Sequence, residues 1–273
     1  QQIWLYLQIM LKYLFFIILF SPFSLFSQED LNYYKEYMPE SSCGEIIHYS
    51  HYSISFCKDR KLSEWSIYLL TSNLLNSDPY PRSNNFRQDP NLNGSDARTI
   101  NYKFSGYDRG HLVPAGDMSF ISEIAMSESF YMTNIVPENP GFNRGAKRRV
   151  EKQIRDWTIE FDSLVIITGI VFEDYKESML NDSSKYFIGE DNIFVPKFHY
   201  KVIIDIINNR SIALLMGNYN DVSVPIGEFI YSNTVSIDYL EDLTGLDFFI
   251  KLPEDIELMF EINSGPKITK KHQ

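Results

Sequence analysis

The chain has 273 residues, of which 44% are hydrophobic and 22% are charged, an ordinary globular composition with enough length for one large domain or two small ones. Its formal net charge of −11 argues against a protein that coats nucleic acid, because affinity for phosphate comes largely from Lys and Arg. The charge does not exclude an enzyme that acts on a polyanion, since an enzyme that releases its product needs positive charge only locally.

The first residues are expected to be a targeting segment. Lys12 precedes an apolar run over residues 13–20 that is short for a bilayer span, and Ser27 offers a small residue for cleavage. This pattern predicts a signal peptide over residues 1–27 and a secreted or periplasmic protein with no stable membrane partner. An uncleaved N-terminal anchor is the alternative.

The two cysteines, Cys43 and Cys57, could form a disulfide. The loop between them is short enough to close, and disulfides persist in exported proteins. Two free thiols are the alternative, and with no further cysteine a zinc site is disfavoured.

The first half of the chain combines extended segments with a long loop. Residues 45–57 are predicted to be extended, because β-favouring residues partly alternate along them. Residues 62–75 fit a strand or a short helix around Trp65 and Tyr68. Residues 76–100 are rich in Asn, Asp, Ser and Pro and predict a long loop, and ordered loops of this length are often functional.

The second half begins with the clearest helix signal. Residues 143–161 place apolar side chains three and four residues apart, the period of one buried helix face, and Asn143 is a good residue type for the N-cap. Residues 164–172 are continuously apolar and predict a buried central strand. Two later features are a hairpin of residues 198–207 and 211–216 and a short helix over residues 237–243 closed by Gly245.

The order of these elements predicts the fold class. Strands and helices mix without regular alternation, which indicates an α+β fold rather than a doubly wound sheet. No linker rich in Pro, Gly or Ser interrupts residues 30–265, so residues 28–273 are expected to form a single domain.

The densest chemistry lies in residues 106–118, which place Asp108, Arg109 and His111 around Gly110. Histidine accepts a proton near neutral pH without further tuning, so His111 is a candidate general base. Taken alone, a histidine beside an aspartate is more often a structural hydrogen-bonding residue.

A second cluster follows at helical spacing. Every fourth residue from Asn143 is polar, and Lys147, Glu151 and Arg155 continue one slowly twisting stripe beside the apolar face. An amide oxygen, a nearby carboxylate and several waters suit Mg²⁺, and Arg offers a planar fork that matches phosphate. An ordinary solvated helix face with Glu–Arg pairs explains the same spacing.

Together these residues resemble the DRGH-type non-specific DNA/RNA endonucleases, the ββα-metal nucleases that include endonuclease G. The resemblance covers roughly residues 45–260 and implies a ββα-metal finger embedded in a mixed, mainly antiparallel sheet flanked by helices. It is carried by the motif Asp108–His111, Asn134, residues 142–145, Glu151 and Arg155. Further matching segments are Arg82 with Phe86 and Asp89, residues 128–134, Thr168 with Gly169, residues 196–201 and residues 243–248.

The resemblance implies a Mg²⁺-dependent endonuclease that cuts DNA and RNA, with Mn²⁺ able to substitute. His111 would take a proton from the attacking water, Asn143 would be the direct protein ligand of a single metal ion, and Glu151 would orient metal-bound water. These three residues are expected to face one shared cleft. The remaining roles are to offset charge on the phosphate, for Arg109, Arg155 and Arg82, and to position the histidine loop, for Asn134.

Two residues depart from the family pattern. Family members usually carry Trp at the position of Lys147 and Gln at the position of Glu138. Lys147 is expected to lose aromatic packing and to add positive charge beside the phosphate. It belongs to a basic run that fits either a phosphate-binding cleft or a solvated helix face, formed by Arg144, Lys147, Arg148, Arg149, Lys152 and Arg155.

Two other functions remain open. A relative that binds nucleic acid without cutting it would be signalled by loss of His111 or Asn143, and both are present. A phosphodiesterase for small substrates with the same metal site would be revealed by activity on a model diester but not on polynucleotides. A homodimer is compatible with the sequence.

Overall fold

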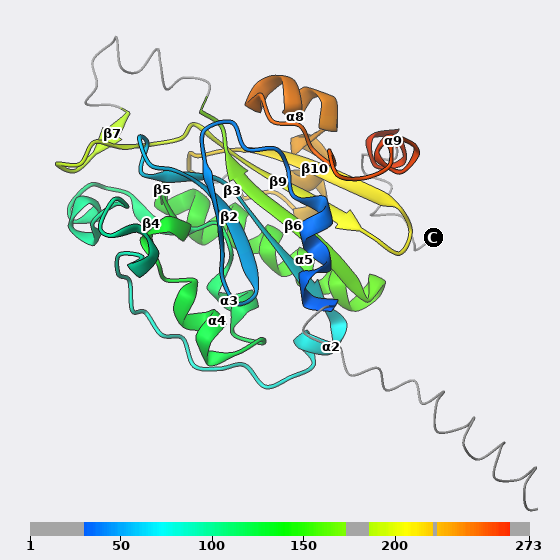
Figure 1. Ribbon diagram of the computed structural model, residues 1–273, viewed down its shortest axis with the longest axis horizontal. Coiled ribbons are helices and arrows are strands. Elements are labelled where there is room, and N and C mark those ends of the chain that lie inside the picture. Colours follow the sequence, from blue (N-terminus) through cyan, green and yellow to red (C-terminus); the bar gives the residue numbers. More distant parts are fainter. Residues whose placement is uncertain (1–29, 173–185, 221–222, 263–273) are drawn as a thin grey trace, which may run out of the picture. The chain divides into compact units, whose positions relative to one another are not determined.

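The computed structural model describes residues 30–172, 186–220 and 223–262, and the described residues from Tyr34 onward form one compact unit (Figure 1). The expected signal peptide, residues 1–27, lies outside the described residues. Among the helices that the structure describes, none combines the length and the apolar character needed to cross a membrane.

Seven strands of the described chain form one antiparallel sheet. The apolar strand predicted near residues 164–172 is its centre, and the predicted hairpin lies beside it, so both predictions are confirmed. In spatial order the strands are β1 (Glu45–His48), β2 (Tyr52–Cys57), β3 (Leu62–Thr71), β6 (Ser163–Ile170), β9 (Phe198–Asp205), β10 (Arg210–Gly217) and β11 (Thr234–Val235).

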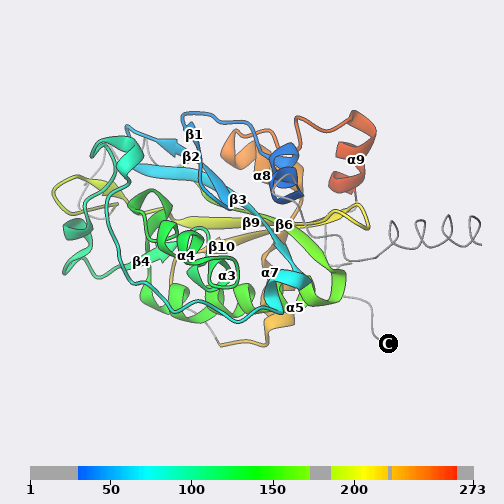
Figure 2. The same cartoon turned by 60° about the horizontal axis from the view of Figure 1, so that its bottom comes forward.

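Alternation along the strands gives this sheet two apolar faces. On β3, Tyr68 and Leu70 face one core cluster, whereas Ile67 and Leu69 face the other. Figure 2 shows the helices distributed over both sides of the sheet. The first side carries α3 (Ala115–Met118), α4 (Glu123–Glu128), α5 (Arg148–Phe161) and α7 (Ile226–Asn233), and the second carries α8 (Ile237–Thr244) and α9 (Glu254–Ile262).

Short elements complete the described chain. The segment predicted as a strand or a short helix is both, because β3 is followed directly by α2 (Ser72–Leu75), which Thr71 caps through its side chain. The predicted helix near residues 237–243 is α8, and Gly245 ends it at φ +68°. The remaining elements are η1 (Asp30–Tyr37), η2 (Pro90–Leu92), η3 (Thr99–Tyr102), η4 (Met132–Asn134), β7 (Phe187–Ile188) and β8 (Ile193–Phe194).

A small ββα unit lies at one end of the sheet (Figure 1). Its strands β4 (Asp108–His111) and β5 (Ile135–Glu138) pair antiparallel, with His111 opposite Ile135. The chain then enters η5 (Phe142–Lys147), a wide π-helical turn, and continues into α5. Single π-helical turns are frequent at functional sites, because they re-aim side chains within a helix.

The helix differs at its start from the prediction. Asn143 is not the N-cap, because helical geometry already begins at Phe142 and the residue before it, Gly141, is also helical. Asn143 lies instead in the first turn of η5. The cysteines are joined as a disulfide between Cys43 and Cys57, with their Cα atoms 5.4 Å apart.

Candidate active site

His111 is the last residue of β4, so a hydrogen-bonded strand fixes its backbone. Gly110 is required just before it, since a Cβ there would overlap the carboxyl group of Glu138 on the neighbouring strand. The imidazole packs edge-on against Phe130, with ring centroids 4.9 Å apart, and Phe86 lies 5.5 Å away. These rings leave His111 only 9% exposed.

The imidazole of His111 is held neutral. Burial lowers its pKa well below the ordinary value of 6.5, and the charges of Arg82, Lys147 and Arg109 lower it further. A hydrogen bond with the backbone of Arg109 raises the pKa, but by less than these effects lower it. Its Nε2 atom is buried and has no hydrogen-bond partner among the described residues. An unpaired, unprotonated ring nitrogen is the state that a general base requires.

Asn134 ties down the chain that follows His111. Its side chain is buried and saturated, because Nδ2 donates to the carbonyls of Val113 at 3.0 Å and Ser129 at 2.8 Å, while Oδ1 accepts from the amide of Val113 at 2.9 Å. Its backbone carbonyl also accepts from the amide of Leu112. These contacts are what a residue that positions the histidine loop needs.

Asn143 is oriented by Asp108, a residue of the motif to which sequence reasoning gave no separate role. The amide Nδ2 of Asn143 donates to Oδ2 of Asp108 at 2.8 Å, which leaves the amide oxygen of Asn143 for another partner. Arg144 donates to both carboxylate oxygens of Asp108, at 2.8 and 2.6 Å. Burial alone would raise the pKa of Asp108, but the bonds from Arg144 and Asn143 lower it below its usual value.

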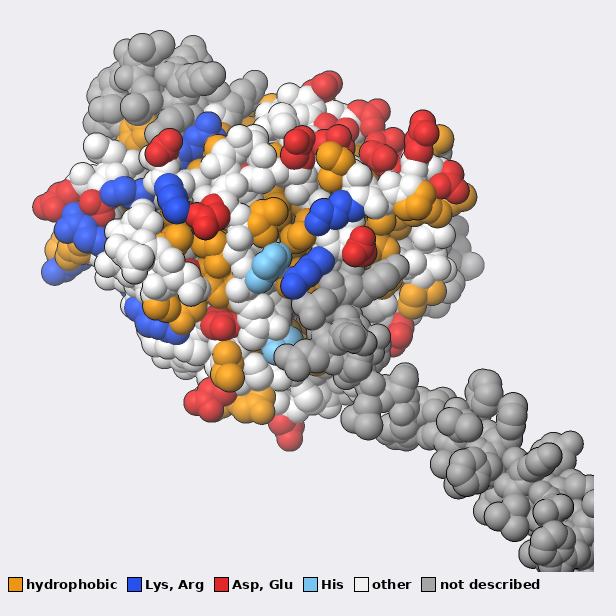
Figure 3. Space-filling model, in the orientation of Figure 1, with side chains coloured by type: hydrophobic (Ala, Val, Ile, Leu, Met, Phe, Trp, Pro, Cys, Tyr) orange, Lys and Arg blue, Asp and Glu red, His pale blue; other side chains and the backbone are white. Residues whose placement is uncertain are grey.

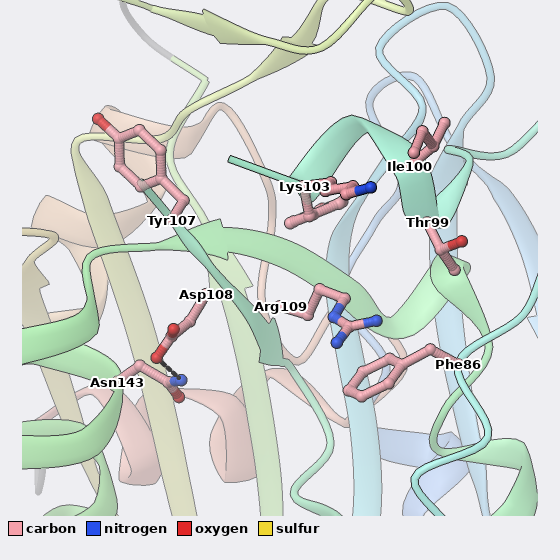
Figure 4. Close-up of a pocket in the computed structure, with 9 residues that line it drawn as sticks. Phe86, Thr99, Ile100, Lys103, Tyr107, Asp108, Arg109 and Asn143 are labelled. Atoms are coloured by element: carbon pink, nitrogen blue, oxygen red, sulfur yellow. Dashed lines mark hydrogen bonds between the residues drawn. The ribbon is translucent and has the colours of Figure 1, made fainter. Parts of the chain in front are cut away.

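A cavity of about 530 Å³ opens beside this pair (Figure 4). Asp108 and Asn143 line one side of it, and Arg109 lines the other, with its guanidinium carbon 4.0 Å above the ring of Phe86. Tyr107 also borders the cavity. The guanidinium of Arg109 is exposed there, so it is available to an anion.

Glu151 and Arg155 lie deeper along α5. Burial raises the pKa of Glu151 against the opposing charges of Lys147 and Lys201, and its carboxylate makes no hydrogen bond to any described residue. Arg155 is half-buried and donates to Oδ1 of Asp117 at 2.5 Å. Asp117 also accepts from the hydroxyl of Tyr68, so a buried network fixes the direction of Arg155.

The upstream loop carries Arg82, Phe86 and Asp89, and Asp89 anchors it. The buried Asp89 carboxylate accepts hydrogen bonds from the hydroxyls of Tyr49 and Thr133. This anchor holds Phe86 against His111. It also places the exposed Arg82 near Phe130, at 4.9 Å from the ring centroid, where it is electrostatically coupled to both His111 and Glu151.

The two departures from the family pattern form one buried ion pair. Nζ of Lys147 donates to Oε1 of Glu138 at 2.5 Å and to the backbone carbonyl of His111 at 2.5 Å. Burial raises the pKa of Glu138 to about 7, against the opposing charge of Lys147. Lys147 therefore points into the core and positions the histidine strand, rather than adding charge beside the phosphate as expected.

The rest of the basic run lies on the outer surface of η5 and α5. A second cavity of about 430 Å³ is lined there by Arg144, Arg148, Arg149, Lys152 and Arg155. Acidic side chains gather elsewhere, over α8 and α9 at the upper right of Figure 3. They are Asp238, Glu241, Asp242, Glu254, Asp255, Glu257 and Glu261.

The site is thus more divided than the sequence suggested. Asn143 and Arg109 share the larger cavity, but His111 and Glu151 do not line it, and Arg155 lines the second. The reason is that Phe86 and Phe130 cover the imidazole. Neither the phenylalanine cover nor the roles of Asp108 and Asp117 could be found from spacing, because they depend on how separate segments meet.

Comparison with known proteins identifies the family. The sequence model of a protein family, described as DNA/RNA non-specific endonuclease, matches residues 30–255 of this chain. Nuclease EXOG of Danio rerio is 33% identical over 219 residues, which cover 78% of this chain and 62% of that protein. Nuclease C1 of Cunninghamella echinulata var. echinulata is 30% identical, over 76% of this chain and 84% of its own. The chain spans about three fifths of the length of the EXOG relatives that it matches.

The fold has a solved counterpart. A chain in the crystal structure of the EndoG/EndoGI complex superposes with a TM-score of 0.71 over 88% of this chain and 97% of that chain, at 23% identity. This likeness confirms the predicted α+β class with a ββα unit in a mainly antiparallel sheet.

The predicted localisation is wrong. The EXOG relatives and human endonuclease G, 30% identical over 74% of this chain, are named as mitochondrial proteins. A basic residue before a short apolar run indicates a targeting segment but does not by itself specify the compartment. These relatives contradict a secreted or periplasmic protein.

Sequence, fold and site agree on the family. The matching model extends over most of the described residues, and Asp108–His111, Asn134, Asn143, Glu151 and Arg155 occupy one ββα unit and its surroundings. This chain belongs to the DNA/RNA non-specific endonuclease family.

Proposed function

We propose that this chain is a metal-dependent endonuclease that hydrolyses phosphodiester bonds of DNA and RNA, with His111 as general base and Asn143 as the protein ligand of a single Mg²⁺. The observation that carries the proposal is the neutral, unpaired Nε2 of His111. It lies in the same ββα unit as an asparagine whose amide oxygen is left available. Residues 28–273 are proposed as one endonuclease domain.

The residues fit a hard cation with a large hydration shell. Asp108 accepts a hydrogen bond from the amide nitrogen of Asn143, and this bond fixes the direction of the amide oxygen. The Glu151 carboxylate is free of hydrogen bonds to the described residues and could orient water. One direct oxygen ligand suits Mg²⁺, which keeps several waters, and bound Mg²⁺ supplies Lewis-acid stabilisation of the phosphate oxygens.

The chain's own groups perform the remaining steps. His111 accepts a proton from water on Nε2, because burial keeps that nitrogen unprotonated. Lys147 holds the backbone carbonyl of His111 and Asn134 holds that of Val113, so the chain at and after the base is fixed. Arg109 presents an exposed guanidinium at the cavity, where it offsets charge that grows on the phosphate.

The first test is metal removal. Purified protein is expected to degrade plasmid DNA and RNA with Mg²⁺ or Mn²⁺ and to stop when a chelator is added, because one protein ligand holds the ion only weakly. Gel electrophoresis of both substrates measures the result. Undiminished cleavage with chelator would contradict the metal assignment, and cleavage of a small model diester alone would favour the phosphodiesterase alternative.

Recognition is expected to run through phosphates. The basic cavity on α5 and the exposed Arg109 offer charge rather than base-reading groups, so affinity for random oligonucleotides should fall steeply as salt rises. Binding isotherms at several salt concentrations, with sequencing of the cleavage ends, measure this. A single preferred cleavage sequence on random DNA would count against the prediction.

A further inference from the structure

Phe104 is an exposed aromatic residue in an unfavourable backbone conformation. Its side chain is 95% exposed, and its φ angle of +60° lies in the left-handed region that bulky residues rarely adopt. Such conformations cost of order 1–3 kcal/mol and persist where the surrounding structure, or a function, maintains them. The fold itself gains little from this ring, because almost none of it is buried.

Other residues with positive φ do not share this combination. Most of them are Asn or Asp, such as Asn84, Asn93 and Asn209, whose short polar side chains tolerate the left-handed region. Phe249 is also aromatic, but it is fully buried and packs against Phe260 with ring centroids 5.2 Å apart. Burial offsets the cost at Phe249, and nothing comparable does so at Phe104.

The position of Phe104 connects it to the proposed active site. It follows η3 and precedes β4, four residues before Asp108. Ile100, in η3, and Lys103, which follows η3, line the cavity that Arg109 and Asn143 border (Figure 4). They also line, with Phe104, a neighbouring cavity of about 430 Å³. The loop is therefore the wall between the two cavities.

The loop places a cation beside the exposed ring. The ammonium of Lys103 lies 5.0 Å from the centroid of the Phe104 ring, so a cation accompanies the exposed aromatic face. Ile100 adds a side chain that is 54% exposed. Proteins that bind single-stranded nucleic acid combine positive charge along the backbone with aromatic rings on which bases stack.

We propose that Phe104 is a stacking platform for an unpaired nucleobase next to the scissile phosphate, with Lys103 on the phosphate of that nucleotide. The inference rests on the proposed function, because it places the base beside the Arg109–Asn143 cavity. It also specifies the substrate: strands with an accessible base, single-stranded or locally opened, bind better than closed duplex. A docking site for another protein would not need continuity with that cavity.

The test measures binding separately from cleavage. All variants are made in the His111→Ala chain and measured with Mg²⁺ present. Phe104→Gly removes the ring and Phe104→Trp keeps an aromatic ring. The control, Tyr239→Ala, removes an exposed aromatic side chain from α8 on the other side of the sheet. The probe is a single-stranded DNA 12-mer carrying 2-aminopurine at one position at a time. Phe104→Gly is expected to weaken binding by about 5- to 150-fold, the cost of one lost base stack.

The other arms give the expected pattern. The His111→Ala chain should quench 2-aminopurine, Phe104→Trp should keep that quenching, and Tyr239→Ala should bind as tightly as the His111→Ala chain alone. A strand that is abasic throughout should bind the His111→Ala chain more weakly, but it should bind Phe104→Gly as well as the normal strand does. The melting temperature of Phe104→Gly should equal or exceed that of the parent, since glycine relieves the backbone strain.

The proposal is overturned if Phe104→Gly binds the single strand as tightly as the parent, or if the abasic strand loses affinity equally with both proteins. Binding that depends on Phe104, together with no cleavage of DNA or RNA by the chain that keeps His111, would sink the nuclease proposal and leave the stacking site standing. The reverse outcome is that the chain with His111 cleaves nucleic acid but that Phe104→Gly does not change binding. That outcome removes only the stacking site.

Discussion

The His111→Ala variant is expected to cleave nucleic acid at least about 10²-fold more slowly than the parent while keeping its fold, the usual scale for loss of a general base. The structure gives the reason, since Nε2 of His111 is the buried, unpaired and neutral nitrogen of the site. Initial rates on plasmid DNA measure the loss, and the melting temperature reports whether the fold remains.

A matched control is His48→Ala. His48 ends the edge strand β1, and its Nδ1 atom forms a hydrogen bond with the hydroxyl of Ser53 at 2.7 Å, away from the ββα unit, so its loss should leave the cleavage rate unchanged. If His111→Ala cuts as fast as His48→Ala, His111 is structural and the proposed mechanism is wrong.

The pH dependence has a defined sign. Because the pKa of His111 lies well below 6.5, the imidazole remains a base as the pH falls, and kcat/KM should hold between pH 7.5 and pH 6. An unshifted histidine would lose about fourfold over that interval, because its neutral fraction would fall with the pH. The same shift affects stability. Below pH 6.5 the unfolded chain binds more protons at this histidine than the folded chain does, so the free energy of unfolding should decrease as the pH falls. The His111→Ala variant should show a smaller decrease.

The Lys147→Met variant is expected to lower the free energy of unfolding by about 3–5 kcal/mol, because it leaves the buried Glu138 carboxyl without its partner. Urea denaturation measures this loss. The variant should also cleave more slowly, since Lys147 donates to the carbonyl of His111.

Lys152→Met is the control on the same helix. Its pair with Asp156 is exposed, and its loss should cost about 0.5 kcal/mol or less.

Combining Glu138→Gln with Lys147→Met should restore most of that stability, because no buried charge is then left unpaired. The combination Glu138→Gln with Lys147→Trp, which introduces the residues usual in the family, should do the same if the tryptophan fits. Additive losses in the double variant would mean that Glu138 and Lys147 are not coupled, against their 2.5 Å contact.

Much of the fold follows from local patterns in the sequence. Continuous apolar residues marked β6, an Asn–Asn turn marked the β9–β10 hairpin, and Gly245 marked the end of α8. These signals are local, because strand and helix periods repeat within a few residues. The order of the sheet, in which β6 pairs with β3 and β9, depends on long-range contacts that no local pattern contains.

The candidate site divides in the same way. Residue types and spacing pointed to His111 and Asn143, and the structure places both in the ββα unit. Spacing could not reveal that Lys147 turns inward to Glu138, because a helix position and a strand position meet only in the folded chain. Asn143 was expected to cap the helix, but the wide turn η5 starts one residue earlier. Such a turn has no clear sequence signature.

The separation of charge described above gives the molecule an electric dipole moment. Its negative end is the acidic surface of α8 and α9, and its positive end is the basic surface of η5 and α5 on the opposite side of the sheet. An approaching polyanion attracts the basic end and repels the acidic end, so the protein rotates before the two molecules touch. The uneven distribution of charge, rather than the net charge, therefore turns the basic face toward an approaching polyanion.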